Sequence, residues 1–205
     1  NIYHLYIAIL ANIIYLFPGR SLKVIGVTGT DGKTTTTNLI HHILTTGGEK
    51  VASISSLGAV IKGKRYDTGY HTTTLSSLML QKLLRKAVNE GAKYMAIEVT
   101  SHAIDQHRIF GIPFAVGVLT NVTNEHLDYH KTYDSYLRTK TALLRKAKIA
   151  VTNKDDGSYT FLADIEKKKG PKYWMTYGLT EGSDVNPKEF PFETKLIGEF
   201  NTYNV

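Results

Sequence analysis

The segment 26–37, GVTGTDGKTTTT, places glycines, a lysine and a run of threonines between a β-branched run and an apolar helix. It misses the strict phosphate-loop pattern G-x-x-x-x-G-K-[ST] by one residue, because the first glycine stands at Gly26 and not one position later. Backbone N–H groups of a glycine turn and a helix N-terminus bind anionic oxygens, lysine adds a positive charge, and a threonine hydroxyl can face Mg²⁺. A glycine turn capped by threonine alone would not require the lysine. We therefore predict a nucleotide triphosphate site formed by Gly29, Thr30, Asp31, Gly32, Lys33, Thr34 and Thr35.

Polar residues that could hold a metal follow two other apolar runs. Glu98 ends the run YMAIEV, where a carboxylate is costly unless it is paired or bound to a metal. A Mg²⁺ ion shared with Thr34 is the natural partner for that carboxylate. His126 stands among acidic residues after the run FAVGVLTN and could bind a second cation, although a lone histidine is more often structural. These residues predict a site that brings a triphosphate and divalent cations together.

The elements that must position these residues alternate between β-branched runs and helical patterns, which is typical of a parallel sheet with helices on its faces. The fold class that we expect is therefore α/β, a mostly parallel sheet that contains a phosphate loop and is flanked by helices. Ligands of such sheets gather at the carboxyl ends of the strands, where the polar residues above all lie. Expected strands are 22–28, 51–56, 94–99, 114–121, 149–153 and 173–178, with 192–200 as a further candidate; expected helices are 33–46, 76–91, 133–146 and 159–168; and 58–74 fits a hairpin or an irregular excursion.

The first twenty residues form a separate expected element, an N-terminal apolar helix. Residues 2–17 are apolar apart from His4 and Asn12, and Pro18-Gly19 would end the helix. The segment is shorter than the roughly 20 residues that span a bilayer, and it lacks the basic start and the cleavage site of a signal peptide. One interpretation packs the helix on the domain. The other lays it in a membrane interface, with its tyrosines at the headgroups.

Composition favours a globular protein that binds phosphorylated small molecules. Hydrophobic residues make up 42% and charged residues 21% of the 205 residues, which argues against disorder. The lack of cysteine excludes disulfides, thiolate metal sites and a cysteine nucleophile, and is compatible with a reducing, cytoplasmic setting. The net charge of +7 suits polyanions, but the basic residues are scattered without interleaved aromatics. We therefore expect no nucleic-acid partner.

Five ordered segments carry a family resemblance: GVTGTDGKTTT, EVTSHAIDQHR, TNVTNEHLDYH, YLRTK and LIGEFNTYN. From about Val24 to Asn204 they resemble the Mur ligases, most of all the branch that adds the third amino acid to UDP-N-acetylmuramoyl-dipeptide. The resemblance implies a central ATP-binding domain over residues 21–205, which activates a carboxylate as an acyl phosphate for attack by an amine. It implies ATP and Mg²⁺ as cofactors and a nucleotide-linked or peptide carboxylate and an amino acid as partners. The implied pathway is peptidoglycan precursor synthesis.

The resemblance also implies roles for residues of the metal site. Lys33 would hold the β- and γ-phosphates, Thr34 and Glu98 would bind one Mg²⁺, and His126 would bind the second. Lys140, in YLRTK, matches a lysine that the family carbamylates to help hold that second ion. Lys33, His126 and Lys140 would thus serve catalysis, while cations and loop dipoles screen the repulsion between phosphate and carboxylate.

Contacts to the nucleotide and the substrate follow from the same resemblance. Asn201 and Asn204 match an element whose asparagine contacts adenine, and Asn121 is assigned to the nucleotide site with them. The substrate residues would be Thr73, Thr74, Ser101, His102 and Arg108.

Several positions depart from the family pattern. Leu75 replaces the proline of the substrate loop, Thr100 replaces a serine, Glu125 replaces the aspartate before the histidine, and Asp31 replaces an asparagine. Glutamate keeps the charge of aspartate, so metal binding is little affected. The lost proline weakens the inference about which substrate is bound.

The chain has about 25 residues before the phosphate loop, which are too few for a UDP-binding domain, and it stops after NTYNV. We therefore expect an incomplete central domain, with neither a UDP-binding N-terminal domain nor a C-terminal domain. Two alternatives stay open. One is an amide ligase like folylpolyglutamate synthetase, and the other is a non-catalytic ATP-binding module that acts with a partner. Contact through residues 2–17 would associate a cytoplasmic protein with a membrane.

Overall fold

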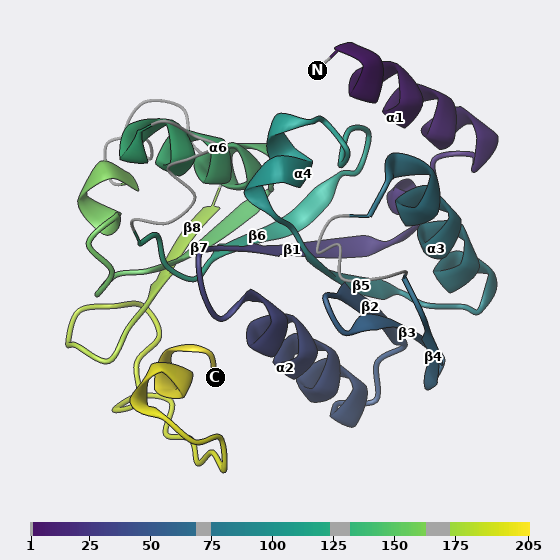
Figure 1. The fold of residues 1–205 in the computed structure, drawn as a ribbon. Coiled ribbons are helices and arrows are strands. Elements are labelled where there is room, and N and C mark those ends of the chain that lie inside the picture. Colours follow the sequence, from purple (N-terminus) through teal and green to yellow (C-terminus); the bar gives the residue numbers. More distant parts are fainter. Residues whose placement is uncertain (1, 69–74, 124–131, 163–172) are drawn as a thin grey trace.

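An eight-stranded sheet forms the centre of the molecule (Figure 1). The computed structural model describes residues 2–68, 75–123, 132–162 and 173–205. The strands lie in the order β4-β3-β2-β5-β1-β6-β7-β8. Their bounds are β1 Lys23–Thr28, β2 Val51–Ser55, β3 Gly58–Ile61, β4 Lys64–Tyr66, β5 Tyr94–Glu98, β6 Phe114–Leu119, β7 Ile149–Asn153 and β8 Tyr173–Tyr177.

The sheet is parallel from β2 to β8, and the hairpin of β3 and β4 extends it on one side with antiparallel pairing. This confirms the expected mostly parallel sheet and the hairpin. Strand β1 lies between β5 and β6, so the chain passes from one half of the sheet to the other around it. Such a switch point opens a crevice at the carboxyl ends of the strands, which is where the phosphate loop begins.

Helices cover both faces of the sheet (Figure 1). Helix α2 lies on one face, while α3, α4 and α6 lie on the other. Ser76 caps α3 as expected, because its hydroxyl oxygen accepts a hydrogen bond from Met79 N at 3.3 Å. The helical elements are α1 Ile2–Ile14, α2 Lys33–Thr46, α3 Ser77–Asn89, α4 Ser101–Asp105, α6 Tyr133–Lys146, and the 3₁₀ turns η1 Pro18–Ser21 and η2 Glu199–Tyr203.

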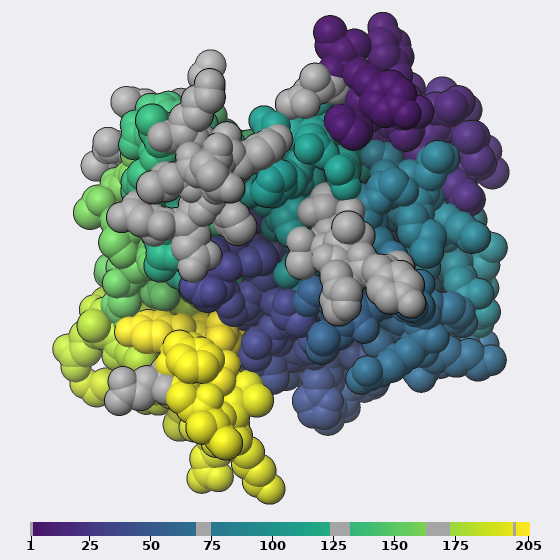
Figure 2. All heavy atoms as spheres, in the orientation of Figure 1, coloured from purple at the N-terminus to yellow at the C-terminus, as the bar shows by residue number. Residues whose placement is uncertain are grey.

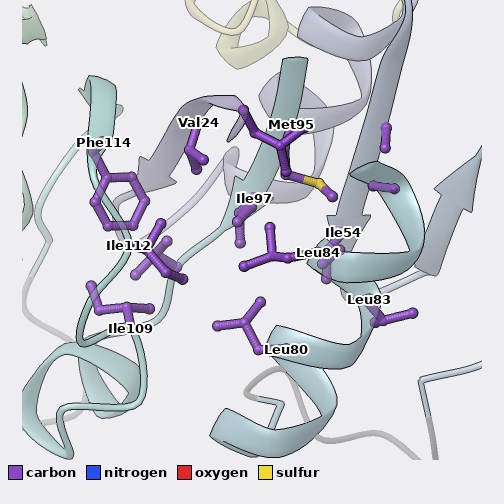
Figure 3. Close-up of a cluster of buried hydrophobic side chains, with 14 of the residues drawn as sticks. Val24, Ile54, Leu80, Leu83, Leu84, Met95, Ile97, Ile109, Ile112 and Phe114 are labelled. Atoms are coloured by element: carbon purple, nitrogen blue, oxygen red, sulfur yellow. The ribbon is translucent and has the colours of Figure 1, made fainter. Parts of the chain in front are cut away.

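The main core fills the space between the sheet and the layer of α3 and α4 (Figure 3). Leucines of α3 at helical spacing point toward the side chains of β1, β2 and β5, because a helix that packs on a sheet needs one continuous apolar face. This packing fixes the carboxyl ends of the central strands relative to one another, which the site requires. The labelled side chains are Val24, Ile54, Leu80, Leu83, Leu84, Met95, Ile97, Ile109, Ile112 and Phe114.

Helix α1 packs against α3, which confirms that the N-terminal helix lies on the domain. Its side chain Asn12 is buried and donates hydrogen bonds to Ala8 O and Phe110 O, both at 2.8 Å. The helix ends at Ile14, earlier than expected, because Leu16 and Phe17 adopt positive φ angles of 56° and 52° before η1 begins. No helix of the described residues is both long and apolar enough to span a bilayer.

One expected element near the C-terminus differs from the structure, and another is described only in part. Residues 192–200 were expected as a last strand, and this is wrong, since 191–197 form no strand and η2 follows. Gly198, at φ 101°, turns the chain there, and beside β8 the isolated parallel bridge is made by Val185 instead, with Tyr177. The expected helix 159–168 is helical over 159–162, and the rest lies outside the described residues.

Arg85, on α3, forms hydrogen bonds with the backbone at the end of α1. Its guanidinium donates to Tyr15 O at 3.0 and 2.7 Å and to Leu16 O at 3.0 Å, which satisfies carbonyls at the end of α1. We expect Arg85→Ala to lower the free energy of unfolding by about 2 kcal/mol, because three charge-assisted hydrogen bonds that join α3 to the residues after α1 are lost. Urea unfolding followed by circular dichroism measures this, with the exposed Lys82→Ala on the same helix as control. A change within about 0.5 kcal/mol for both variants would contradict it.

Candidate functional site

The phosphate loop connects β1 to α2 at the carboxyl edge of the sheet, and two of its glycines cannot be replaced without displacement. Gly29 and Gly32 have φ angles of 153° and 78°. A Cβ atom on Gly29 would lie 1.8 Å from Thr120 Oγ1, and one on Gly32 would lie 2.1 Å from Asn204 Oδ1. The glycines therefore allow two distant segments to approach the loop backbone closely.

The segment that follows β6 holds the loop in one orientation. Asp31 O accepts hydrogen bonds from Thr120 Oγ1 at 2.6 Å and Asn121 Nδ2 at 3.2 Å, and Asp31 N donates to Asn121 Oδ1 at 2.9 Å. Because the C=O and N–H of a trans peptide point in opposite directions, anchoring Asp31 O directs the N–H of Gly32 away from this segment. The first N–H groups of α2 have no intrahelical acceptor and carry the positive end of the helix dipole. Together these groups are suited to bind anionic oxygens.

Tyr177 supports the same segment from β8. Its hydroxyl donates to Thr120 O at 3.3 Å. Burial, reinforced by the nearby Asp156, raises the pKa of Tyr177 far above its usual value, so the hydroxyl remains a donor at any physiological pH. The carbonyl of Thr120 is thus fixed from β8 while its hydroxyl fixes the phosphate loop.

Two lysines contact the carbonyls of the loop. Lys33 Nζ donates to Thr30 O at 2.5 Å, so in this structure its ammonium bends back over the loop. Lys140 is only 2% exposed, and its Nζ donates to Gly29 O and lies 4.3 Å from the centre of the Tyr136 ring. The structure therefore places Lys140 beneath the phosphate loop.

A buried carboxylate meets the loop at Thr34. Glu98, 8% exposed at the end of β5, accepts a hydrogen bond at Oε2 from Thr34 Oγ1 at 2.9 Å. Ser56 N donates to the same oxygen at 2.9 Å, and the hydroxyls of Ser56 and Thr34 lie 2.9 Å apart. A carboxylate with two hydroxyls is a set of hard oxygen donors, which fits Mg²⁺. The described residues show no group of three or more His, Asp or Glu side chains arranged for a metal, and His126 lies outside them.

Ser56 was not predicted from the sequence. The signal that could have found it is its position immediately after β2, because β2 is the neighbour of β5 in the sheet. Residues that leave adjacent parallel strands at the same edge approach each other. Only the strand order makes Ser56 a neighbour of Glu98.

The other predicted site residues fall into two groups. Ser101 and His102 begin α4 directly after β5, close to Glu98 in sequence, and Arg108 lies between α4 and β6. The N-terminus of α4 is capped by Thr100, whose hydroxyl oxygen accepts from Ala103 N at 3.2 Å. The predicted substrate residues Thr73 and Thr74 lie outside the described residues.

Asn204, one of the two C-terminal asparagines, contacts the start of α2, although the two lie far apart in the sequence. Asn204 Oδ1 accepts from Thr36 Oγ1 at 3.4 Å and lies beside Gly32. Asn204 Nδ2 donates to Asn201 Oδ1 at 3.0 Å, and Asn201 Nδ2 donates to Ile197 O at 2.7 Å. Hydrogen bonds thus join Ile197, Asn201 and Asn204, and Asn204 connects this segment to the start of α2.

A pocket of about 470 Å³ lies beside this segment. Apolar side chains of α2, β6 and β7 line one side of the pocket. Residues of the segment after β8 and of 202–205 line the other side. Its lining offers mainly van der Waals contacts, so it is suited to hold an apolar group and not to do acid–base chemistry. The apolar side chains of the first side are those of Ile40, Ile43, Val118 and Val151.

Comparison with known proteins decides the family. The model of the Mur ligase middle domain matches residues 27–205. The chain belongs to the Mur ligase family. Its phosphate loop, the buried carboxylate at the end of β5 and the two asparagines near the C-terminus therefore belong to a Mur ligase middle domain, and its sheet has the architecture that the resemblance implied.

Curated Mur ligases from bacteria resemble the chain over almost all of its length. It is 38% identical to UDP-N-acetylmuramyl-tripeptide synthetase 2 of Oceanobacillus iheyensis, covering 97% of this chain and 44% of that protein. It is 36% identical to UDP-N-acetylmuramoyl-L-alanyl-D-glutamate--2,6-diaminopimelate ligase of Geobacillus thermodenitrificans, covering 97% and 45%. The chain thus spans less than half the length of these relatives.

Solved structures agree with the family. A UDP-N-acetylmuramoyl-L-alanyl-D-glutamate--2,6-diaminopimelate ligase superposes with a TM-score of 0.78 at 29% identity, over 89% of this chain and 41% of that one. A folylpolyglutamate synthase of Mycobacterium tuberculosis gives a TM-score of 0.67 at 16% identity, over 84% and 47%. At that identity the second likeness shows a shared fold alone.

Proposed function

We propose that the protein of which this chain forms part is an ATP- and Mg²⁺-dependent ligase of peptidoglycan precursor synthesis. It would join an amino acid to the carboxylate of a UDP-N-acetylmuramoyl-peptide. The observation that carries the proposal is the 2.9 Å hydrogen bond between Thr34 and Glu98, which places a buried carboxylate beside the phosphate loop. The names of the curated relatives support the choice of substrates.

The residues of the loop would bind and orient the triphosphate. Lys33 would leave Thr30 O and turn to the β- and γ-phosphates, while the first N–H groups of α2 bind their oxygens. Thr34 and Glu98 would hold Mg²⁺, which supplies positive charge where phosphate and carboxylate must approach each other. Asn121, Asn201 and Asn204 would serve the nucleotide.

A second ion and the substrate contacts complete the proposal. His126 and a carbamylated Lys140 would hold a second Mg²⁺, although Lys140 donates to Gly29 O in this structure. The carboxylate substrate would meet the segment after β5 and residues that precede α3 in the sequence. We assign these contacts to Thr73, Thr74, Ser101, His102 and Arg108.

A coupled assay tests the proposal with the full-length protein. Phosphate release is measured with ATP, Mg²⁺ and UDP-N-acetylmuramoyl-dipeptide, and single amino acids are added in turn, with mass spectrometry of the product. We expect phosphate release to require both the carboxylate and one amino acid. Release with a folate carboxylate instead would support the folylpolyglutamate-synthetase-like alternative. Calorimetric binding of Mg·ATP without release under any combination would support the non-catalytic module.

We also propose that the protein lies in the cytoplasm and contacts an anionic membrane surface through α1. Seven large apolar or aromatic side chains of α1 are 37–72% exposed, and they share an arc of about 140° on a helix that is fixed to the domain. Exposed lysines stand at the starts of four parallel strands, on the edge opposite the phosphate loop, and η1 leads from α1 directly to that edge. Figure 2 shows α1 protruding at one corner of the molecule. The apolar residues are Ile2, Tyr3, Tyr6, Ile9, Leu10, Ile13 and Ile14, and the lysines are Lys23, Lys50, Lys93 and Lys148.

Vesicle sedimentation tests this contact. We expect the full-length protein to bind phosphatidylglycerol-containing vesicles better than pure phosphatidylcholine vesicles, and less at high salt, because each lysine near the surface adds about 1 kcal/mol. The Tyr6→Glu/Ile13→Glu variant should bind on the order of tenfold less, because charged side chains replace apolar ones in the interface. Ile43→Glu, on α2, is the matched control. Equal binding of variant and wild type would refute the contact, and a dimer that the double variant abolishes would assign the face to a second copy.

A further inference from the structure

Asp155 makes an unusual number of hydrogen bonds for a side chain close to the protein surface. It follows β7 by two residues, and its Oδ2 accepts from Leu179 N at 2.6 Å and Thr180 N at 3.3 Å. The hydroxyl of Thr180 donates to Oδ1, and Tyr203 adds a further side-chain hydrogen bond. A carboxylate offers about four acceptor positions, so these donors use its capacity. One side chain thereby joins the end of β7 to two segments that lie later in the chain.

The charge of Asp155 is maintained by this arrangement. Burial acts to raise the pKa of the carboxyl, but the hydrogen bonds from Thr180, Leu179 and Tyr203 together lower it below its usual value. The carboxylate is therefore ionised at neutral pH, and its hydrogen bonds are charge-assisted. Burial raises the pKa of Tyr203, and the negative charge of Asp155 raises it further. The phenol therefore keeps the proton that it donates.

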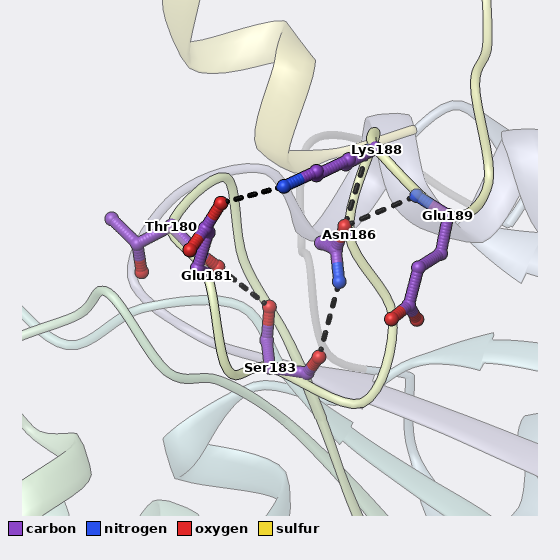
Figure 4. A network of polar contacts seen from close by, with 6 residues as sticks. All are labelled: Thr180, Glu181, Ser183, Asn186, Lys188 and Glu189. Atoms are coloured by element: carbon purple, nitrogen blue, oxygen red, sulfur yellow. Dashed lines mark hydrogen bonds and ion pairs between the residues drawn. The ribbon is translucent and has the colours of Figure 1, made fainter.

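The first segment that Asp155 holds is the loop after β8, which is braced internally (Figure 4). Asn186 Oδ1 accepts from Lys188 N at 3.1 Å and Glu189 N at 3.2 Å, and Asn186 Nδ2 donates to Ser183 O at 3.3 Å. Ser183 Oγ donates to Thr180 O at 3.1 Å. These hydrogen bonds within the loop hold its backbone in one conformation next to Asp155.

The second segment is η2, whose Tyr203 contacts Asp155 and is followed by Asn204. Tyr203 is the neighbour of Asn204, and Asn204 lies against Gly32 and Thr36 at the start of α2. Figure 2 shows the C-terminal segment resting on α2 at the end of the molecule away from α1. A shift of η2 would therefore move both asparagines relative to the helix that starts at the phosphate loop.

We infer that Asp155 is a positioning residue for the adenine end of the nucleotide, because through Tyr203 it holds Asn201 and Asn204 in place beside the phosphate loop. The inference rests on the proposed function, since it takes these asparagines to be the adenine contacts. It adds that the affinity for the base and the affinity for the triphosphate depend on different parts of the structure. The loop, which Thr120 and Asn121 hold, serves the triphosphate together with Lys33 and Glu98, while Asp155 and Tyr203 act on the side chains at the base.

Calorimetry with two probes tests the inference on the full-length protein in the presence of Mg²⁺. The probes are ATP and inorganic tripolyphosphate, which lacks the base. For Tyr203→Phe and for Asp155→Asn we expect the Kd of ATP to rise about three- to tenfold, because one or more hydrogen bonds to η2 are lost. The Kd of tripolyphosphate should stay within about twofold, because the phosphate loop is unchanged. The matched control is Tyr173→Phe, which removes a tyrosine hydroxyl at the start of β8, whereas the loop that Asp155 contacts follows the other end of that strand.

The outcomes separate the inference from the proposed function. Wild-type protein that binds neither probe would overturn the proposed function, and the adenine assignment with it. Wild-type binding with an unchanged ATP affinity in both variants would overturn the inference alone. Equal weakening of ATP and tripolyphosphate would also overturn it, because that result indicates general loosening. Faster amide hydrogen exchange confined to residues 199–204 in Tyr203→Phe is expected, and unchanged exchange there would count against the inference.

Discussion

Replacing Lys33 by alanine is expected to lower kcat/KM of the full-length protein about 10³-fold, which corresponds to about 4 kcal/mol of lost transition-state stabilisation. The physical reason is that Lys33 provides the side-chain charge at the start of α2, where negative charge gathers on the transferring phosphoryl group. In the structure its ammonium is already on the loop, bonded to Thr30 O, so only a side-chain rotation brings it to a phosphate. Steady-state phosphate release with saturating carboxylate and amino acid measures the effect.

Two further variants make the result specific to the position of this charge. Lys62→Ala removes a lysine whose side chain is 71% exposed and paired with Glu90, and it should leave turnover within about twofold of wild type. Lys33→Arg keeps the charge but not the compact ammonium, so it should recover little activity. Lys33→Ala with more than about a tenth of wild-type activity would refute the assignment of the phosphate loop.

The central architecture was predictable because its signals are local. Buried parallel strands read as continuous apolar runs, and the segment between β1 and α2 contains its glycines and lysine within a few residues. The sequence therefore predicted the parallel sheet, the glycine turn between a strand and a helix and the position of Glu98 at a strand end, and the structure confirmed these elements. The binding of a triphosphate by this turn stays a prediction. The contact between Thr34 and Glu98 followed from the rule that ligands gather at the carboxyl edge.

The features that escaped prediction depend on long-range packing. Ser56 joins the site only because β2 lies beside β5, and Asn204 reaches Thr36 across 168 residues. The strand expected at 192–200 failed because a local sequence says nothing about whether a sheet edge is available, and the isolated bridge beside β8 is made by Val185. The early end of α1 reflects two residues at positive φ that no composition rule indicates. Local patterns thus predict individual helices and strands, whereas the contacts between these elements depend on the whole fold.

The second large effect is expected at Glu98. Replacing it by glutamine should lower kcat/KM by about 10²- to 10³-fold at a Mg²⁺ concentration that saturates the wild type. Glutamine has nearly the size of glutamate and its carbonyl oxygen can still accept hydrogen bonds from Thr34 Oγ1 and Ser56 N. The fold should therefore persist, while the charge that binds the cation is lost. The concentration of Mg²⁺ that gives half-maximal rate should rise at least about tenfold, which a titration of rate against Mg²⁺ measures.

The titration distinguishes a metal site from a structural carboxylate. If Glu98 served only to accept its two hydrogen bonds, Glu98→Gln would leave the Mg²⁺ dependence unchanged. Any loss of activity would then come from a lower stability of the fold. If it binds Mg²⁺, Glu98→Asp should retain part of the activity with a raised Mg²⁺ requirement, because the charge remains at a shorter reach. Glu90→Gln, at the exposed end of α3, is the matched control and should change neither quantity. An unchanged half-maximal Mg²⁺ concentration in Glu98→Gln would contradict a role of Glu98 in binding the cation that lets the γ-phosphate approach the substrate carboxylate.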